Sequence, residues 1–308
     1  MEIFLIFSVL FMVTSGQEDD GINVHTRIIG GRRARPHEFP NQVAIKMITG
    51  ETCGGTIIDN HWILTAAHCV THIFKNTKTM VRRVKVIDPK ILTVYLGAID
   101  VYGTNTIQVG VEQIYVHPKY NPTVNKENDI ALLRTIRECI RQRKHDDPDA
   151  VFSDKAVVPF SSKTTVGQKV WTVGYGMVDP LVPVANDYLK TVDVKILPDE
   201  VCSKQFKTPL EKYNPKLMIC AGYLQGGKDS CNGDSGGPLL FKGNQENDGN
   251  DAGATHVILG IVSHGVNGTK CAEKNMGAAY TRVGAYVKWM KDIIDKYDAD
   301  QGNSVDAN

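Results

Sequence analysis

Short apolar runs separated by turn residues dominate the chain from residue 28 onward. Gly, Pro, Asn or Asp marks most of the breaks between one run and the next. Repeated short strands with such turn residues between them are typical of an all-β barrel or sandwich. The pattern predicts strands at residues 43–47, 92–96, 109–116, 169–173, 192–197 and 256–262.

The end of the chain has a different period. Its apolar side chains fall near helical spacing, which predicts a C-terminal helix that packs one face on the body. Residues 298–308, after Tyr297, are polar, and we expect them to form a disordered tail. The helical spacing is set by Val283, Val287, Met290, Ile293 and Ile294.

The beginning of the chain resembles a targeting segment. Residues 3–13 are almost wholly apolar, and the small residues Thr14, Ser15 and Gly16 follow. This run is too short to span a bilayer comfortably, so it predicts a secretory signal peptide over residues 1–16 and a secreted, extracellular protein. Glu2 departs from the positive charge usual at that position, and the alternative is a buried N-terminal strand.

Bulk composition sets limits on size and partners. The 308 residues suffice for one large all-β domain or two small ones, and 42% hydrophobic residues is ordinary for a globular core. A formal net charge of +1 gives no whole-molecule attraction to nucleic acid or to a membrane surface. We therefore expect neither as a partner.

Candidate chemistry begins with a glycine-rich turn at residues 229–238, Asp-Ser-Cys-Asn-Gly-Asp-Ser-Gly-Gly-Pro. It presents the hydroxyl of Ser235, and its small residues let a substrate backbone approach and free N–H groups to face an oxyanion. Such a serine needs a base. His68, in Thr-Ala-Ala-His-Cys, offers an imidazole, and Asp129, at the mouth of an apolar strand, offers a carboxylate.

These three motifs and the Arg-Ile-Ile-Gly-Gly sequence at residues 27–31 stand in the order found in the trypsin/chymotrypsin family of serine peptidases. The chain resembles that family from Ile28 to about Tyr297. The resemblance implies two six-stranded antiparallel β-barrels with the active site in the cleft between them, together with a C-terminal α-helix.

The resemblance also implies a division of roles. Ser235 would be the nucleophile, His68 the general base and Asp129 the group that orients the imidazole. The backbone N–H groups of Gly233 and Ser235 would bind the oxyanion.

Activation follows from the same resemblance. Residues 17–27 would be an activation peptide, and cleavage after Arg27 by a trypsin-like protease would free the amine of Ile28. That ammonium would insert beside Asp234 and order the oxyanion turn.

Specificity is implied by residues around the primary pocket. Asp229 would lie at its base and select Arg or Lys, because an apolar side chain would leave the carboxylate unpaired. Gly265 would form one wall of this pocket. The opposite wall would be Ala278, or Gly277 if the alignment has a one-residue gap. His264 replaces the usual Trp, which alters the apolar shelf for upstream residues, and Tyr175 replaces another Trp. The implied substrate-binding residues are Asp229, Ser230, Ser263, Gly265 and Ala278.

Seven cysteines in a secreted chain leave one without a partner. The resemblance implies the bridges Cys53–Cys69, Cys202–Cys220 and Cys231–Cys271. Cys139 is then either a buried free thiol or an intermolecular link. Val170 and Phe241 occupy the two positions of a further bridge that many relatives have.

Ligands other than substrate are not indicated. Residues 98–108, where some relatives bind calcium, offer only Asp100 as a carboxylate, and no His/Cys cluster suggests zinc. We expect no metal and no cofactor. The sequon Asn267-Gly268-Thr269 indicates N-glycosylation at Asn267, or an unoccupied signal.

The leading hypothesis is the zymogen of a secreted, monomeric endopeptidase that cleaves after Arg or Lys. We expect narrow specificity for protein or peptide substrates and control by serpin-type or other protease inhibitors. Residues 72–90 and 134–144 are basic insertions, which are either solvated loops or an exosite for an acidic protein or polysaccharide. A third insertion, 243–253, is polar. The alternative function is a catalytically weak or silent binding protein that acts through the basic loops.

Overall fold

The computed structural model describes residues 28–75, 82–103, 106–123, 125–142, 152–159, 161–176, 187–208, 211–243 and 255–305. The predicted signal and activation peptides lie outside these ranges, as does most of the third insertion. No helix among the described residues is long and apolar enough to cross a membrane.

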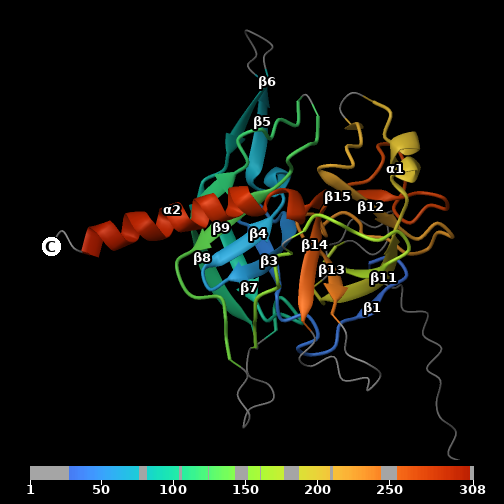
Figure 1. Cartoon of the computed structure of the whole chain (residues 1–308). Helices are drawn as coiled ribbons and strands as arrows, with labels where there is room; N and C mark the ends of the chain where they lie inside the picture. The colour runs from blue at the N-terminus through green and yellow to red at the C-terminus, as the bar shows by residue number, and fades with distance from the viewer. Residues whose placement is uncertain are drawn as a thin grey trace, which may run out of the picture.

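Six antiparallel strands close into the first barrel, at the left of Figure 1. Its side chains alternate with the period of two that strands impose: Leu92, Val94 and Leu96 are buried, and Thr93 and Tyr95 are less so. Around the ring the strands are β2 (Gln42–Met47), β3 (Thr52–Asp59), β4 (Trp62–Thr65), β9 (Ala131–Thr135), β8 (Ile107–Val116) and β7 (Leu92–Leu96).

The second barrel lies beside the first, at the right of Figure 1. It closes through the pairing of β11 with β12, and the short strand β1 (Arg32–Arg33) adds to the outer edge of β11. Its six strands in ring order are β11 (Lys190–Ile196), β10 (Lys169–Gly174), β13 (Pro238–Lys242), β14 (His256–His264), β15 (Ala278–Arg282) and β12 (Met218–Gly222). The expected two-barrel architecture is confirmed, and each of the six predicted strands is present with its ends shifted by at most two residues.

Two α-helices accompany the barrels: α1 (Asp199–Gln205) and α2 (Val287–Val305). The predicted C-terminal helix is confirmed, with Met290 buried and Val287, Ile293 and Ile294 packed against the main core. The helix continues past Tyr297 to Val305, where the sequence predicted a disordered tail, and Figure 1 shows it leaving the body. A helix closes its backbone hydrogen bonds within itself, so this exposed polar segment needs no apolar face to stay helical.

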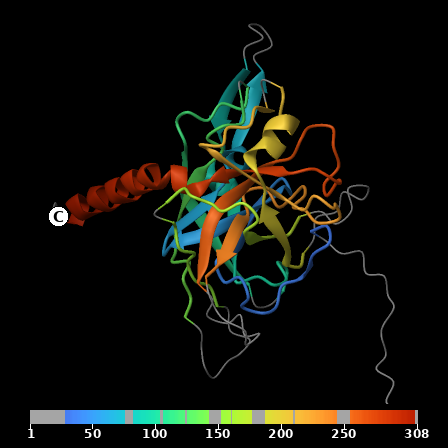
Figure 2. The same cartoon turned by 45° about the vertical axis from the view of Figure 1, so that its right-hand side comes forward.

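The first basic insertion contains a β-hairpin. Strands β5 (Thr71–Lys75) and β6 (Arg82–Val86) pair only with each other and rise above the first barrel in Figures 1 and 2. Ile73 and Phe74 are about half exposed on it. The 3-10 turn η2 (Pro89–Ile91) then leads into β7.

Three disulfides link the expected pairs, Cys53–Cys69, Cys202–Cys220 and Cys231–Cys271. Cys139 is free and fully buried, and its sulfur lies 3.3 Å from Thr135 Oγ1. This matches the buried-thiol alternative.

Val170 and Phe241 replace the further bridge with an apolar contact. The register Trp171–Leu240 between β10 and β13 places Val170 opposite Phe241 when it is continued by one residue. Both side chains pack in one hydrophobic cluster of the second barrel.

A buried carboxylate anchors the segment that follows the predicted activation site. Glu38 accepts hydrogen bonds from the Arg32 guanidinium at 2.7 and 2.5 Å, from the Arg35 backbone N–H at 2.9 Å and from Lys242 Nζ at 3.2 Å. Burial alone would raise the pKa of Glu38, but these donors outweigh it and lower the pKa from 4.5 to about 2.

We expect Glu38→Gln to lower the free energy of unfolding by roughly 3 kcal/mol at pH 7, because it removes the buried negative charge that accepts from Arg32, Arg35 and Lys242. The folded-state pKa is depressed, so this stabilisation is present above pH 4.5 and is lost as the pH falls toward 2. Denaturant unfolding at several pH values measures the difference. Glu51→Gln, at an exposed site, is the control; an equal loss there would contradict the prediction.

Candidate active site

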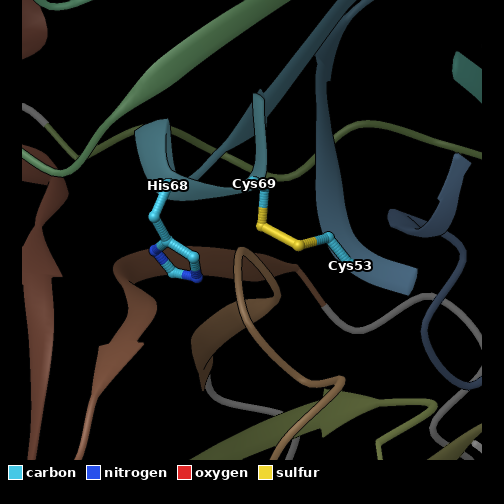
Figure 3. Close-up of side chains that lie close together, drawn as sticks. All are labelled: Cys53, His68 and Cys69. Carbon is cyan, nitrogen blue, oxygen red and sulfur yellow. A yellow bond between two sulfur atoms is a disulfide. The ribbon is translucent and has the colours of Figure 1, made fainter. Parts of the chain in front are cut away.

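The 3-10 turn η1 (Ala67–Val70) presents His68 at the end of β4. Cys69, the next residue, is bonded to Cys53 on β3, so the disulfide holds the turn against the barrel (Figure 3). The His68 imidazole extends from the same turn and is about one-third exposed.

Asp129 lies just before β9 and is 3% exposed. Its Oδ2 lies 2.8 Å from His68 Nδ1, and its Oδ1 accepts the His68 backbone N–H at 2.9 Å. Burial alone would lower the pKa of His68, but the Asp129 charge and hydrogen bond raise it. Burial would raise the pKa of Asp129, but His68 and a hydrogen bond from Ser263 lower it. The pair is thus built to stabilise an imidazolium.

Ser263 and His264 extend this pair into the second barrel. The Ser263 hydroxyl donates to Asp129 Oδ2 at 2.6 Å, and Ser263 Oγ lies 2.9 Å from His264 Nδ1. Because the single hydroxyl proton points to Asp129, His264 must donate its Nδ1 proton to Ser263. Burial, together with the charge of Lys126, lowers the pKa of His264 to about 4, so His264 is neutral at pH 7.

The Ser235 turn is tied to both barrels. The Ser235 carbonyl accepts the Gly54 N–H of β3 at 2.7 Å, and the Gly236 N–H donates to Val262 of β14 at 2.9 Å. Gly233 and Gly236 have φ values of 93° and 79°, which favour glycine. At Gly236 a Cβ would also lie 2.2 Å from the Thr65 hydroxyl, so no larger residue fits.

Asp234 points inward from this turn and is fully buried. Its carboxylate accepts the backbone N–H groups of Cys231 and Gly176, each at 2.8 Å, and no cation of the described residues pairs with it. Burial raises its pKa to about 7. Ile28 is also fully buried, in the hydrophobic cluster of the second barrel.

A cavity of about 480 Å³ opens beside Ser235. Asp229 is half-buried in it: one carboxylate oxygen accepts the Ala272 N–H at 3.0 Å, and the other has no partner among the described residues. Burial raises the pKa of Asp229 to about 6. The predicted substrate-binding residues that line this cavity are Asp229, Ser230, Ser263, Gly265 and Ala278.

Both candidates for the second pocket wall, Gly277 and Ala278, line this cavity, and they face different neighbours. A Cβ on Gly277 would contact Leu197 and the sulfurs of Cys220 and Cys202, so Gly277 faces that cluster. Side chains alternate along β15, which places Ala278 on the same face as Tyr280. The Tyr280 hydroxyl lies 3.2 Å from Ser230 Oγ. Of the two, Ala278 is thus the residue whose side chain shares the face of Tyr280, next to Ser230 of the cavity.

A second cavity, of about 460 Å³, contains His68 and Asp129. Ser263, His264 and Lys126 line both cavities, so the two are neighbours. The fold thus gathers the predicted residues from five separate segments at the junction of the barrels. Asn267 is exposed at the rim of the first cavity.

Potential metal ligands cluster at one point among the described residues, Cys53, His68 and Cys69. The two sulfurs are joined in a disulfide and provide no thiolate (Figure 3). Only the imidazole remains as a strong ligand, which is too few for a structural zinc site.

Sequence reasoning missed two contacts. Lys126 reaches across the junction to Glu211, and no local motif marks either residue. Tyr175, which stands where Trp is usual, is buried, and its hydroxyl donates a hydrogen bond to the Ala98 carbonyl at 2.6 Å.

Comparisons with known proteins agree with this geometry. A family model described as Trypsin matches residues 28–290. Kallikrein 1-related peptidase b3 of Mus musculus is 30% identical over 303 residues, which cover 94% of this chain and 98% of that protein. The clotting factor G beta subunit of Tachypleus tridentatus is 32% identical over 282 residues, 88% of this chain and 80% of that protein. With both barrels, the three disulfides and the His–Asp pair in place, the chain belongs to the trypsin family of serine peptidases.

Proposed function

We propose that this chain is the zymogen of a secreted endopeptidase that cleaves peptide bonds after Arg or Lys. The observation that carries the proposal is the unpaired carboxylate oxygen of Asp229 in the cavity that Ser235 lines. A carboxylate oxygen that is shielded from water and has no hydrogen-bond partner is costly, and a guanidinium or ammonium of the substrate would supply that partner.

The reaction would proceed by acyl transfer. Ser235 Oγ attacks the scissile carbonyl while His68 accepts its proton and later donates it to the leaving amine. Asp129 holds the tautomer of His68 that carries the proton on Nδ1 and stabilises the imidazolium. The N–H groups of Gly233 and Ser235 bind the oxyanion, where one donor is worth about 2.7–4 kcal/mol in related chemistry.

Activation would be completed by a new N-terminus. Asp234 has no cation partner among the described residues. The buried Ile28 shares its hydrophobic cluster with Tyr280, whose pKa is raised mainly by burial and further by the charges of Asp229 and Asp234. An ammonium at Ile28, freed by cleavage after Arg27, would supply that cation.

The experiment is activation followed by labelling. The full chain is cleaved after Arg27, exposed to a fluorophosphonate probe and digested to locate the label, and its cleavage sites are profiled on a peptide library. We expect the probe on Ser235 and cleavage after Arg or Lys. An unlabelled Ser235 would support the silent binding protein, and cleavage after apolar residues would contradict the role of Asp229.

Ala278 should set the preference between the two basic residues. We expect Ala278→Gly to raise the ratio of kcat/KM for arginyl over lysyl substrates by several-fold, up to about tenfold, because removing a methyl makes room for the wider guanidinium. Paired substrates that differ only in that residue measure the ratio. Ala44→Gly, at a buried alanine of β2 outside both cavities, is the matched control. An unchanged ratio in Ala278→Gly would place the wall elsewhere.

A further inference from the structure

Lys126 lies where the two cavities of the active site meet. It lines the cavity that contains Asp229 and also the one that contains His68. It belongs to the loop that leads into Asp129, so it comes from the first barrel, whereas its partner Glu211 comes from the second.

In the ion pair of Lys126 with Glu211, the lysine ammonium is the more exposed group and the glutamate carboxylate is the buried one. Lys126 Nζ lies 2.7 Å from Glu211 Oε1, and the side chains are 35% and 6% exposed, respectively. Glu211 is held further by the Asn267 N–H at 3.2 Å on its other oxygen. A lysine ammonium has three N–H donors, and Glu211 is its one hydrogen-bond partner among the described residues. Two donors therefore remain for a ligand.

The other carboxylate and the buried imidazole that line the His68 cavity among the described residues are engaged or neutral. Asp129 is 3% exposed and is engaged by His68 and Ser263. His264 is neutral at pH 7, as its lowered pKa requires. Among the described residues that line the His68 cavity, and with the histidines taken as neutral, Lys126 is thus the accessible side chain that carries a formal charge; the imidazoles of His68 and His72 lie in the same cavity.

Residues Ser263 and His264 line both cavities, and Gly265 lines the one that contains Asp229. A substrate peptide that binds as an added strand along these residues, with its basic side chain in the Asp229 cavity, would bring the residue just before the basic one to the His68 cavity.

From this juxtaposition we propose that Lys126 is a specificity-determining residue, which selects substrates with an acidic side chain immediately before the basic residue at the cleavage site. The walls suit such a side chain. Ile73 of the hairpin, Tyr120 and Pro122 provide apolar surface for its methylene groups, and the ammonium meets its carboxylate. The inference rests on the proposed peptidase function and deepens it.

The test compares isosteric substrates. The full chain, cleaved after Arg27 by an immobilised trypsin that is then removed, is assayed on coumarin-releasing peptides ending in Glu-Arg, Gln-Arg, Asp-Arg and Asn-Arg. We expect kcat/KM to favour each acid over its amide by about three- to tenfold, through KM more than kcat, and the preference to shrink at high ionic strength.

Three variants assign the effect. Lys126→Gln should bring the acid-to-amide ratio to about one, and Lys126→Glu should bring it below one. Glu211→Gln should raise the ratio, because it removes the competing carboxylate while keeping an acceptor for Asn267. Lys119→Gln, at an exposed lysine of the same loop outside both cavities, is the matched control and should leave the ratio unchanged.

Two results would overturn the proposal. A ratio near one in the native protein, with good turnover of both peptides, contradicts the acidic preference. An unaltered ratio in Lys126→Gln assigns the preference to other residues. Failure to cleave any peptide, with Ser235 unlabelled by the fluorophosphonate, would instead contradict the peptidase function itself.

Discussion

Asp129→Asn is expected to lower kcat by about 10⁴-fold while the protein still folds. Asp129 Oδ2 now accepts two protons, one from His68 Nδ1 and one from the Ser263 hydroxyl. An amide nitrogen in that place would donate to Nδ1 and force the proton of the neutral imidazole onto Nε2. His68 could then no longer accept the proton of Ser235.

The measurement is kcat on an arginyl ester and amide, with circular dichroism and thermal unfolding to establish that the variant is folded. When the loss comes from the wrong tautomer of His68, activity should recover partly at high pH, because hydroxide can then act as the base in place of His68. Asp154→Asn, an exposed aspartate far along the chain, is the control for the loss of one negative charge. A loss of less than tenfold in Asp129→Asn would show that Asp129 does not orient His68.

Arg27→Gln is expected to give a chain that is not processed and that has roughly 10²- to 10³-fold less activity than the cleaved protein. In the uncleaved chain the Asp234 carboxylate is buried with two backbone donors and has no cation partner among the described residues, and burial raises its pKa to about 7. A raised folded-state pKa means that Asp234 stabilises the fold when protonated, below its ordinary pKa, and that this contribution is lost as the pH rises through 7. A new ammonium at Ile28 would offset the cost of burying the ionised Asp234 carboxylate at neutral pH, and would hold the oxyanion turn in place.

Mass spectrometry of the protease-treated chain reports processing, and turnover of an arginyl peptide reports activity. Arg33→Gln, at an exposed arginine nearby, is the matched control and should be processed and activated normally. Asp234→Asn separates the two steps, because it should be cut after Arg27 and stay nearly inactive. Full activity of uncleaved Arg27→Gln would contradict the activation mechanism.

Local pattern was sufficient for much of the fold. Period-two runs such as Leu92–Leu96 determine strands because one face must be buried in a barrel, and the helical period of Val287, Met290 and Ile294 determines α2. The end of α2 was not predictable in this way. Its last turns have no apolar face, and only their internal hydrogen bonds carry the helix to Val305.

The candidate site was likewise predictable only in part. Short motifs around His68 and Ser235 mark chemistry because a nucleophile and its base need particular neighbours within a few residues. The distance from His68 to Asp129, the link from Asp129 to Ser263 and the pairing of Lys126 with Glu211 join residues far apart in the chain. No local spacing encodes such contacts.

The sequence by itself determined the strands, the C-terminal helix and the identity of the reactive groups, because these depend on side-chain period and on chemical type at short range. The tertiary structure alone decided which face of β15 carries the side chains of Ala278 and Tyr280, and that a side chain at Gly277 would instead meet Leu197 and the sulfurs of Cys202 and Cys220. It also decided that burial keeps His264 neutral and that the pairing with Glu211 places the Lys126 ammonium beside His68. Those properties arise only when the two barrels meet.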